Sequence, residues 1–144
     1  MIDRRLEILI VEDNPADVVL AREAFKKTKN NSVLRVVKDG IEAMEFLGKK
    51  GRHANAARPD LIFLDLNLPR KDGREILAEI KADPDLKRIP LVIFSTSMAE
   101  PDIVATYDLG ANSYIVKPME LDEYFETIRR AENFWLTTIT RSAE

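Results

Sequence analysis

Five short apolar runs, separated by segments of helical character, are the feature that most limits how this chain can fold. The runs are four to six residues long and lie at residues 6–11, 33–37, 61–64, 91–94 and 113–116. Between them apolar residues recur at helical spacing, for example over Pro15 to Lys27 and Arg74 to Lys81. Such alternation is typical of a parallel sheet with helices on both faces. The sequence therefore predicts a doubly wound, five-stranded α/β domain.

The composition is that of a globular protein. The chain has 144 residues, of which 45% are hydrophobic, and no apolar run approaches the roughly 20 residues that a membrane helix needs. It has no cysteine and no stretch shaped like a secretory signal, so we expect a cytoplasmic location and no membrane partner. A net charge of −3 argues against nucleic-acid binding by this chain.

Polar side chains follow four of the predicted strands at the ends that share one edge of the sheet. In the strand order 2-1-3-4-5, the first and third strands flank the switch point where ligands bind. Carboxylates that converge there repel one another without a cation, and Mg²⁺ is the natural ion for oxygen ligands beside a phosphate. These edge residues are Glu12 and Asp13 after the first run, Asp65 after the third, Ser95 after the fourth and Lys117 after the fifth.

This set of residues fits phosphoryl chemistry. Asp65 is suited to act as a nucleophile that forms an aspartyl phosphate, and Lys117 is suited to bind a phosphoryl oxygen. Ser95 could donate a hydrogen bond to another oxygen, although Thr96 or Ser97 in the same Ser-Thr-Ser run could supply the hydroxyl instead.

Two further residues have structural interpretations. Gly73, after Asp72, is expected to free the backbone for a turn at the start of the following helix. His53 is the only histidine and lies in a polar loop, so we expect it to be exposed to solvent and to have no partner.

The chain resembles the receiver domains of two-component response regulators over about residues 6–130. The matching features are the acidic pair after the first strand, the stretch DLNLPRKDG, the hydroxyl after the fourth strand and the Lys-Pro after the fifth. The resemblance implies a flavodoxin-like sheet of order 2-1-3-4-5. It also implies one receiver domain over residues 1–144, with a C-terminal extension from about 131 and no output domain.

The resemblance implies how the phosphoryl group is handled. Asp65 would accept it from a sensor histidine kinase, and the domain would catalyse only its own phosphorylation and dephosphorylation, so it is not counted as an enzyme. Mg²⁺, for which Mn²⁺ can substitute, would be held by Asp65, Glu12, Asp13 and the backbone carbonyl of Asn67. The acidic pair is Glu-Asp instead of Asp-Asp, which leaves open whether Glu12 contacts the metal through water.

The resemblance also implies a conformational switch. Ser95 and Tyr114 match the switch pair of the family, with serine in place of threonine, although Tyr114 fits a partly buried core ring equally well. The bond between Lys117 and Pro118 matches a peptide that is usually cis in the family.

The last helix and one polar loop resemble a particular group of response regulators. The segment RRAENFWLTTIT and the polar loop at residues 48–58 are similar to the stand-alone regulators of cyanobacterial and bacterial phytochromes, which makes a phytochrome the expected kinase. The last helix has more apolar residues than one buried stripe needs. We therefore expect Phe134, Trp135 and Leu136 to form an exposed patch, and a homodimer through the fourth and fifth helices and this tail.

Two other functions compete with this interpretation. Many phosphatases and phosphotransferases with an aspartyl nucleophile place a second aspartate two residues beyond it, but Asn67 occupies that position and cannot act as a general acid. A flavin or nucleotide binder needs a Gly/Ser/Thr-rich phosphate loop after the first strand, where Glu12 and Asp13 would repel phosphate.

Overall fold

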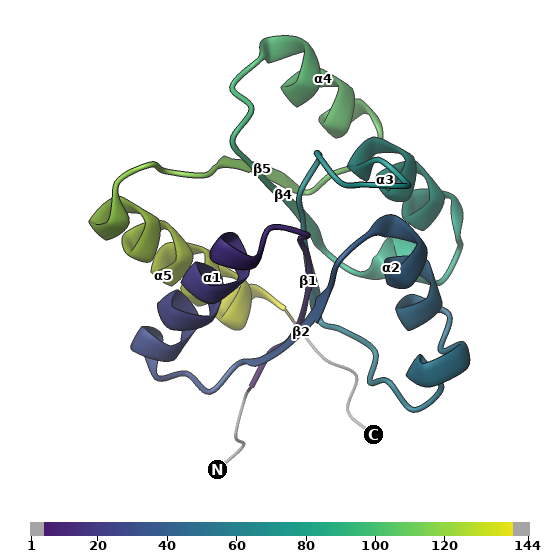
Figure 1. Cartoon of the computed structure of the whole chain (residues 1–144), viewed down its shortest axis with the longest axis horizontal. Coiled ribbons are helices and arrows are strands. Elements are labelled where there is room, and N and C mark those ends of the chain that lie inside the picture. Colours follow the sequence, from purple (N-terminus) through teal and green to yellow (C-terminus); the bar gives the residue numbers. More distant parts are fainter. Residues whose placement is uncertain (1–4, 140–144) are drawn as a thin grey trace.

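Five parallel strands form the sheet that the apolar runs predict, and the prediction of the fold is confirmed. A computed structural model describes residues 5–139, so part of the predicted C-terminal extension, residues 140–144, lies outside the described residues. The sheet order is β2-β1-β3-β4-β5 (Figure 1). The strands are β1 (Glu7–Val11), β2 (Val33–Val37), β3 (Leu61–Leu64), β4 (Leu91–Ser95) and β5 (Ser113–Val116).

Helices cover both faces of the sheet. Figure 1 shows α1 and α5 together on one side, α2 and α3 on the other, and α4 beyond α3. Two short 3₁₀ turns, η1 (Gly51–His53) and η2 (Leu86–Arg88), lie in the connections. The helices are α1 (Pro15–Thr28), α2 (Gly40–Leu47), α3 (Gly73–Ala82), α4 (Glu100–Asp108) and α5 (Leu121–Thr138). None of the helices within residues 5–139 is long and apolar enough to cross a membrane.

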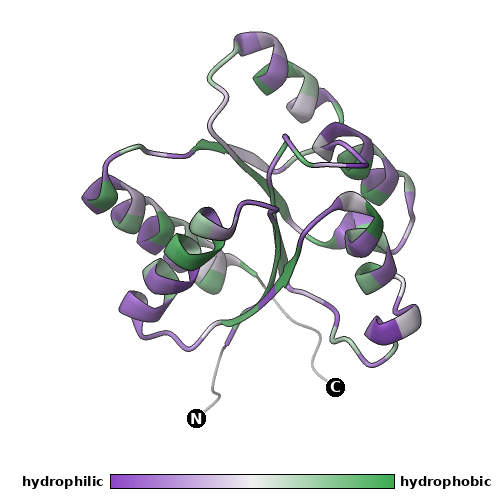
Figure 2. Ribbon diagram, in the orientation of Figure 1, coloured by the Kyte–Doolittle hydropathy of each residue, from purple (hydrophilic) through white to green (hydrophobic). Residues whose placement is uncertain are grey.

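The central strand β3 is buried on both faces, which explains why its sequence is a continuous apolar run. Leu61 and Phe63 pack into the core under α1 and α5, while Ile62 and Leu64 pack into the core under α2 and α3. Figure 2 shows the hydrophobic strands in the middle of the molecule and hydrophilic residues on the outer helix faces. This burial fixes the position at which the chain emerges from the sheet, at Asp65.

The helix starts are set by local capping. Asn14 caps α1 by accepting hydrogen bonds from the N–H groups of Ala16 and Asp17 at 2.9 and 3.2 Å, and Pro15 occupies the first turn. α4 begins at Glu100 and has a proline in its first turn, where the missing N–H costs no hydrogen bond.

The expected exposed patch at the end of α5 is only partly present. Phe134 is 56% exposed, but Trp135 and Leu136 are partly buried and pack against the core under α1 and α5. The prediction was therefore wrong for these two residues. The reason is that α5 is long enough for Trp135 to continue, at helical spacing, the buried stripe that contains Ile128 and Ala131.

Glu132, near the end of α5, hydrogen-bonds to the loop after α1. Glu132 is fully buried and accepts hydrogen bonds from the side chains of Asn30 and Ser32, both at 2.7 Å. Each side-chain oxygen of this buried group thus has a hydrogen-bond partner, and the two bonds hold the end of α5 close to the loop after α1.

Candidate functional site

A cleft of about 460 Å³ opens at the carboxyl ends of the strands. Residues that directly follow β1 and β3 line the cleft, as expected at the switch point of the sheet. The single lysine among the lining residues comes from the chain after β5. The lining residues are Glu12, Asp13, Asn14, Pro15, Asp17, Asp65, Asn67, Thr96 and Lys117.

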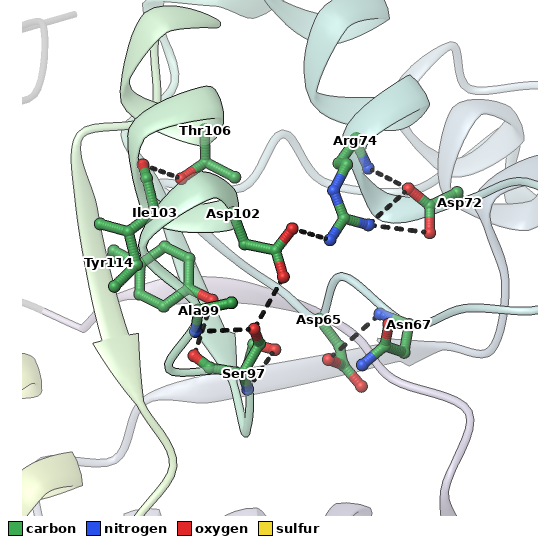
Figure 3. A network of polar contacts seen from close by, with 11 residues as sticks. Asp65, Asn67, Asp72, Arg74, Ser97, Ala99, Asp102, Ile103, Thr106 and Tyr114 are labelled. Carbon is green, nitrogen blue, oxygen red and sulfur yellow. Dashed lines mark hydrogen bonds and ion pairs between the residues drawn. The ribbon is translucent and has the colours of Figure 1, made fainter.

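Three carboxylates of the cleft form a group that suits a metal ion. Glu12, Asp13 and Asp65 each offer an oxygen that lies within 4.8 Å of the oxygens of the other two. Glu12 is buried, Asp13 is exposed, and the side chain of Asp65 is 12% exposed. A set of oxygen donors with this much negative charge fits a hard divalent cation such as Mg²⁺. Asn67 is exposed beside them, and its N–H approaches Asp65 Oδ1 at 3.5 Å (Figure 3).

The ammonium of Lys117 is buried among the same acids. Its Nζ donates hydrogen bonds to Glu12 Oε1 at 2.5 Å and to Asp17 Oδ2 at 3.1 Å, and it lies 3.6 Å from Asp65 Oδ2. Burial alone would lower the pKa of Lys117, but the bond to Glu12 and the charges of Asp65 and Glu12 raise it, so the lysine stays charged. Burial, helped by the charge of Asp65, raises the pKa of Glu12 against the effect of Lys117.

The bond between Lys117 and Pro118 is trans, since the residues that the structure describes include no cis peptide. The expectation of a cis bond was therefore wrong. A trans bond is favoured before proline by about 0.5–1 kcal/mol, and Lys117 reaches the carboxylates with it.

The hydroxyl groups after β4 face different ways. Ser95 is fully buried, and its Oγ accepts a hydrogen bond from the N–H of Ser97 at 3.2 Å. Thr96 is exposed and lines the cleft. The structure thus brings Thr96, one of the two alternatives to Ser95, directly to the cleft.

A polar network links the loop after β4 to α3, α4 and β5 (Figure 3). The hydroxyl of Tyr114, whose ring is partly buried, donates to the carbonyl of Ser97 at 2.9 Å, and the hydroxyl of Ser97 donates to Asp102 at 2.7 Å. Arg74 then joins Asp102 at 2.6 Å to Asp72 at 3.1 Å. These bonds to Ser97 and Arg74 lower the pKa of Asp102. No local sequence pattern indicates the pair of Arg74 and Asp102, because its members lie 28 residues apart on different helices.

Gly73 is needed for close packing and not for an unusual backbone angle. It is absent from the residues with positive φ, so the predicted role in freeing the backbone was wrong. A Cβ atom at this position would lie 2.4 Å from the carbonyl oxygen of Asp65 and 2.6 Å from Cα of Leu66. The start of α3 therefore packs directly on the backbone that carries Asp65.

His53 is not a free, solvent-exposed side chain, which corrects the prediction. Its Nε2 lies 3.2 Å from Glu42 Oε2, its ring packs 5.2 Å from that of Phe46, and its side chain is 16% exposed. The turn η1 folds the polar loop back onto α2 and so creates these contacts.

The sequence analysis missed Asp17 as a site residue. It lies in the first turn of α1, where an acid is expected for the helix dipole alone. Its place in the first turn of a helix that starts directly after the acidic pair was the signal that could have placed it near the cleft.

Comparison with known proteins agrees with this geometry. Residues 8–129 match the family described as the response regulator receiver domain. Response regulator Rcp1 of Synechocystis sp. is 48% identical over 136 residues, which cover 94% of this chain and 92% of that protein. Two solved structures are similar over 96% of this chain and 99% of theirs. The phosphorylated cyanobacterial phytochrome response regulator RcpA has a TM-score of 0.90 at 51% identity, and the Mn²⁺-bound form of Rcp1 has 0.88 at 48%. This chain therefore belongs to the family of response regulator receiver domains.

Proposed function

We propose that this chain is a phosphorylation switch in which Asp65 accepts a phosphoryl group from the phosphohistidine of a sensor histidine kinase. The observation that carries the proposal is the position of Asp65 in an open cleft, beside the buried cation of Lys117 and two further acids. An oxygen of Asp65 forms the new bond to phosphorus, the bond between phosphorus and the donor nitrogen breaks, and the imidazole recovers a proton.

The site would hold Mg²⁺, with Mn²⁺ as a substitute, through Asp13, Asp65, Glu12 and the backbone carbonyl of Asn67. The ion supplies charge that neutralises phosphoryl oxygens when it is bound. Both oxygens of Glu12 already have partners, Lys117 and the N–H of Asn14 at 3.1 Å, which favours contact with the metal through water.

Asp13→Asn should weaken Mg²⁺ binding by about tenfold or more, since it removes the negative charge of the exposed member of the acidic group. The same change should slightly raise the melting temperature in metal-free buffer, because it relieves repulsion between carboxylates. Calorimetric Mg²⁺ titration and thermal melts measure the two effects. Glu23→Gln, which removes one charge from an exposed position of α1, is the matched control. An unchanged titration would remove Asp13 from the site.

The switch itself would act through the hydroxyl after β4 and through Lys117, which move towards the phosphoryl group. Ser95 and Tyr114 are the proposed switch pair, with Thr96 as the alternative hydroxyl because it lines the cleft. The network from Tyr114 through Ser97 supports a coupling of this loop to the surface of α4, β5 and α5. The domain would act on its own Asp65 and not on a separate substrate, and Asn67 in place of a general acid argues against a phosphatase.

We propose that this chain acts in the cytoplasm and that its kinase partner is a phytochrome, since the similar protein RcpA is a cyanobacterial phytochrome response regulator. Phosphotransfer profiling against the histidine kinases of the same genome tests this. Transfer that is fastest from a kinase without a phytochrome would contradict the partner but not the switch.

We also propose that the chain forms a homodimer through α4 and α5. Val104 and Tyr107 on α4 and Phe134 on α5 are apolar side chains with 49%, 48% and 56% exposure. Sedimentation at micromolar concentration should give a dimer, and Phe134→Glu should weaken it at least tenfold, while Val19→Glu on α1 should not. A monomer before and after phosphorylation would refute this proposal.

A further inference from the structure

The cleft contains a fourth acid for which neither the metal group nor the phosphoryl transfer provides a use. Asp17 lines the cleft from the first turn of α1, and its side chain is 33% exposed. It is not one of the three residues whose oxygens gather for a metal ion. Its carboxylate accepts a hydrogen bond from Nζ of Lys117 at 3.1 Å.

The distances around Lys117 rank its partners. Glu12 and Asp17 accept hydrogen bonds from Nζ at 2.5 and 3.1 Å, whereas Asp65 lies at 3.6 Å, beyond the usual range of a hydrogen bond. Nζ is therefore hydrogen-bonded to Glu12, after β1, and to Asp17, on α1, but only ion-paired with Asp65. Two of its three N–H groups have these partners, and we expect a closer approach to Asp65 to lengthen the bond to Asp17, which is the longer of the two.

The balance of charges in the cleft also favours slow phosphorylation. Its lining residues include four carboxylates, those of Glu12, Asp13, Asp17 and Asp65, and one ammonium. A bound divalent ion and Lys117 together supply three positive charges, so one negative charge stays uncompensated before any phosphoryl donor arrives. Small phosphoryl donors are themselves anions, and they are repelled by that excess.

From these contacts we propose that Asp17 is a positioning residue that holds the ammonium of Lys117 away from Asp65 and so slows phosphorylation. This inference rests on the proposed function. It predicts that removing the Asp17 charge frees Lys117 to approach Asp65 and lowers the repulsion of an anionic donor. Both effects increase the rate of phosphoryl transfer to Asp65.

The test compares Asp17→Asn with the wild-type chain and with Glu23→Gln, which removes the same charge from the same helix at an exposed position away from the cleft. With acetyl phosphate at saturating Mg²⁺, we expect Asp17→Asn to raise the rate constant of phosphorylation about three- to tenfold, and the gain to shrink as ionic strength rises. Asp17→Glu should restore a rate close to that of the wild type. Intact-mass spectrometry follows the reaction.

A purely structural role for Asp17 at the helix start predicts different results. Asp17→Asn would then lower the melting temperature slightly and leave the rate equal to that of Glu23→Gln, which would overturn the proposal. A slower rate would overturn it as well.

A crystal structure of unphosphorylated Asp17→Asn provides a test that needs no phosphorylation. Nζ of Lys117 should move to within about 3.0 Å of Asp65, and an unchanged separation would refute the inference. Failure of the wild-type chain to be labelled at Asp65 would instead refute the proposed function, and the structure of the variant would still decide the role of Asp17.

Discussion

Asp65→Asn is expected to abolish covalent phosphorylation by acetyl phosphate in the presence of Mg²⁺. The amide is a far weaker nucleophile than the carboxylate and cannot form a stable acyl phosphate. It also removes the negative charge of one of the three acids that gather in the cleft, so Mg²⁺ binding should weaken at the same time. Intact-mass spectrometry after incubation with the donor measures the labelling, and circular dichroism confirms that the variant is folded.

The matched control is Asp108→Asn, which makes the same chemical change at an exposed position at the end of α4. It should be labelled at the rate of the wild type. If Asp65→Asn still acquires one phosphoryl group, the nucleophile is a different residue, and peptide mapping would then examine Asp13, the exposed acid of the same group.

Gly73→Ala should destabilise the domain and impair the site together. The added Cβ would lie 2.4 Å from the carbonyl oxygen of Asp65 and 2.6 Å from Cα of Leu66. Both are backbone atoms, which cannot rotate out of the way as a side chain can. We expect a loss of about 1–3 kcal/mol in the free energy of unfolding, as for other overpacked positions. Because the backbone that has to move carries Asp65, the rates of labelling and the Mg²⁺ affinity should fall as well.

Gly51→Ala separates these two effects. Gly51 has a φ of 57°, which a residue with Cβ adopts at a cost of about 1–2 kcal/mol, but its surroundings are open. This control should therefore lose stability without loss of labelling, as measured by urea denaturation and by intact mass. Equal labelling of Gly73→Ala and Gly51→Ala would show that the packing of α3 against Asp65 does not matter for the site.

The sheet was predictable because parallel strands that are buried on both faces have uninterrupted apolar sequences. Predicted and observed bounds agree for β2, β3 and β5, and β1 and β4 differ by one residue. The sequence marks α4 only weakly, since this helix buries only Thr106 and so has a weak apolar stripe. The apolar residues at the end of α5 were expected to be exposed, whereas Trp135 extends the buried stripe that packs on the core.

The sequence by itself determined the fold class, the edge of the sheet at which the acids gather and the residue types that phosphoryl chemistry needs. These follow from the order of strands and from which residue comes directly after each one, so they are local properties of the chain. Only the tertiary structure decided that Asp17 shares Lys117 with Glu12, that Arg74 meets Asp102, and that Gly73 makes room for the backbone at Asp65. The first two contacts join residues that are 100 and 28 positions apart along the chain. All three depend on how the helices pack against the sheet, which no local pattern encodes.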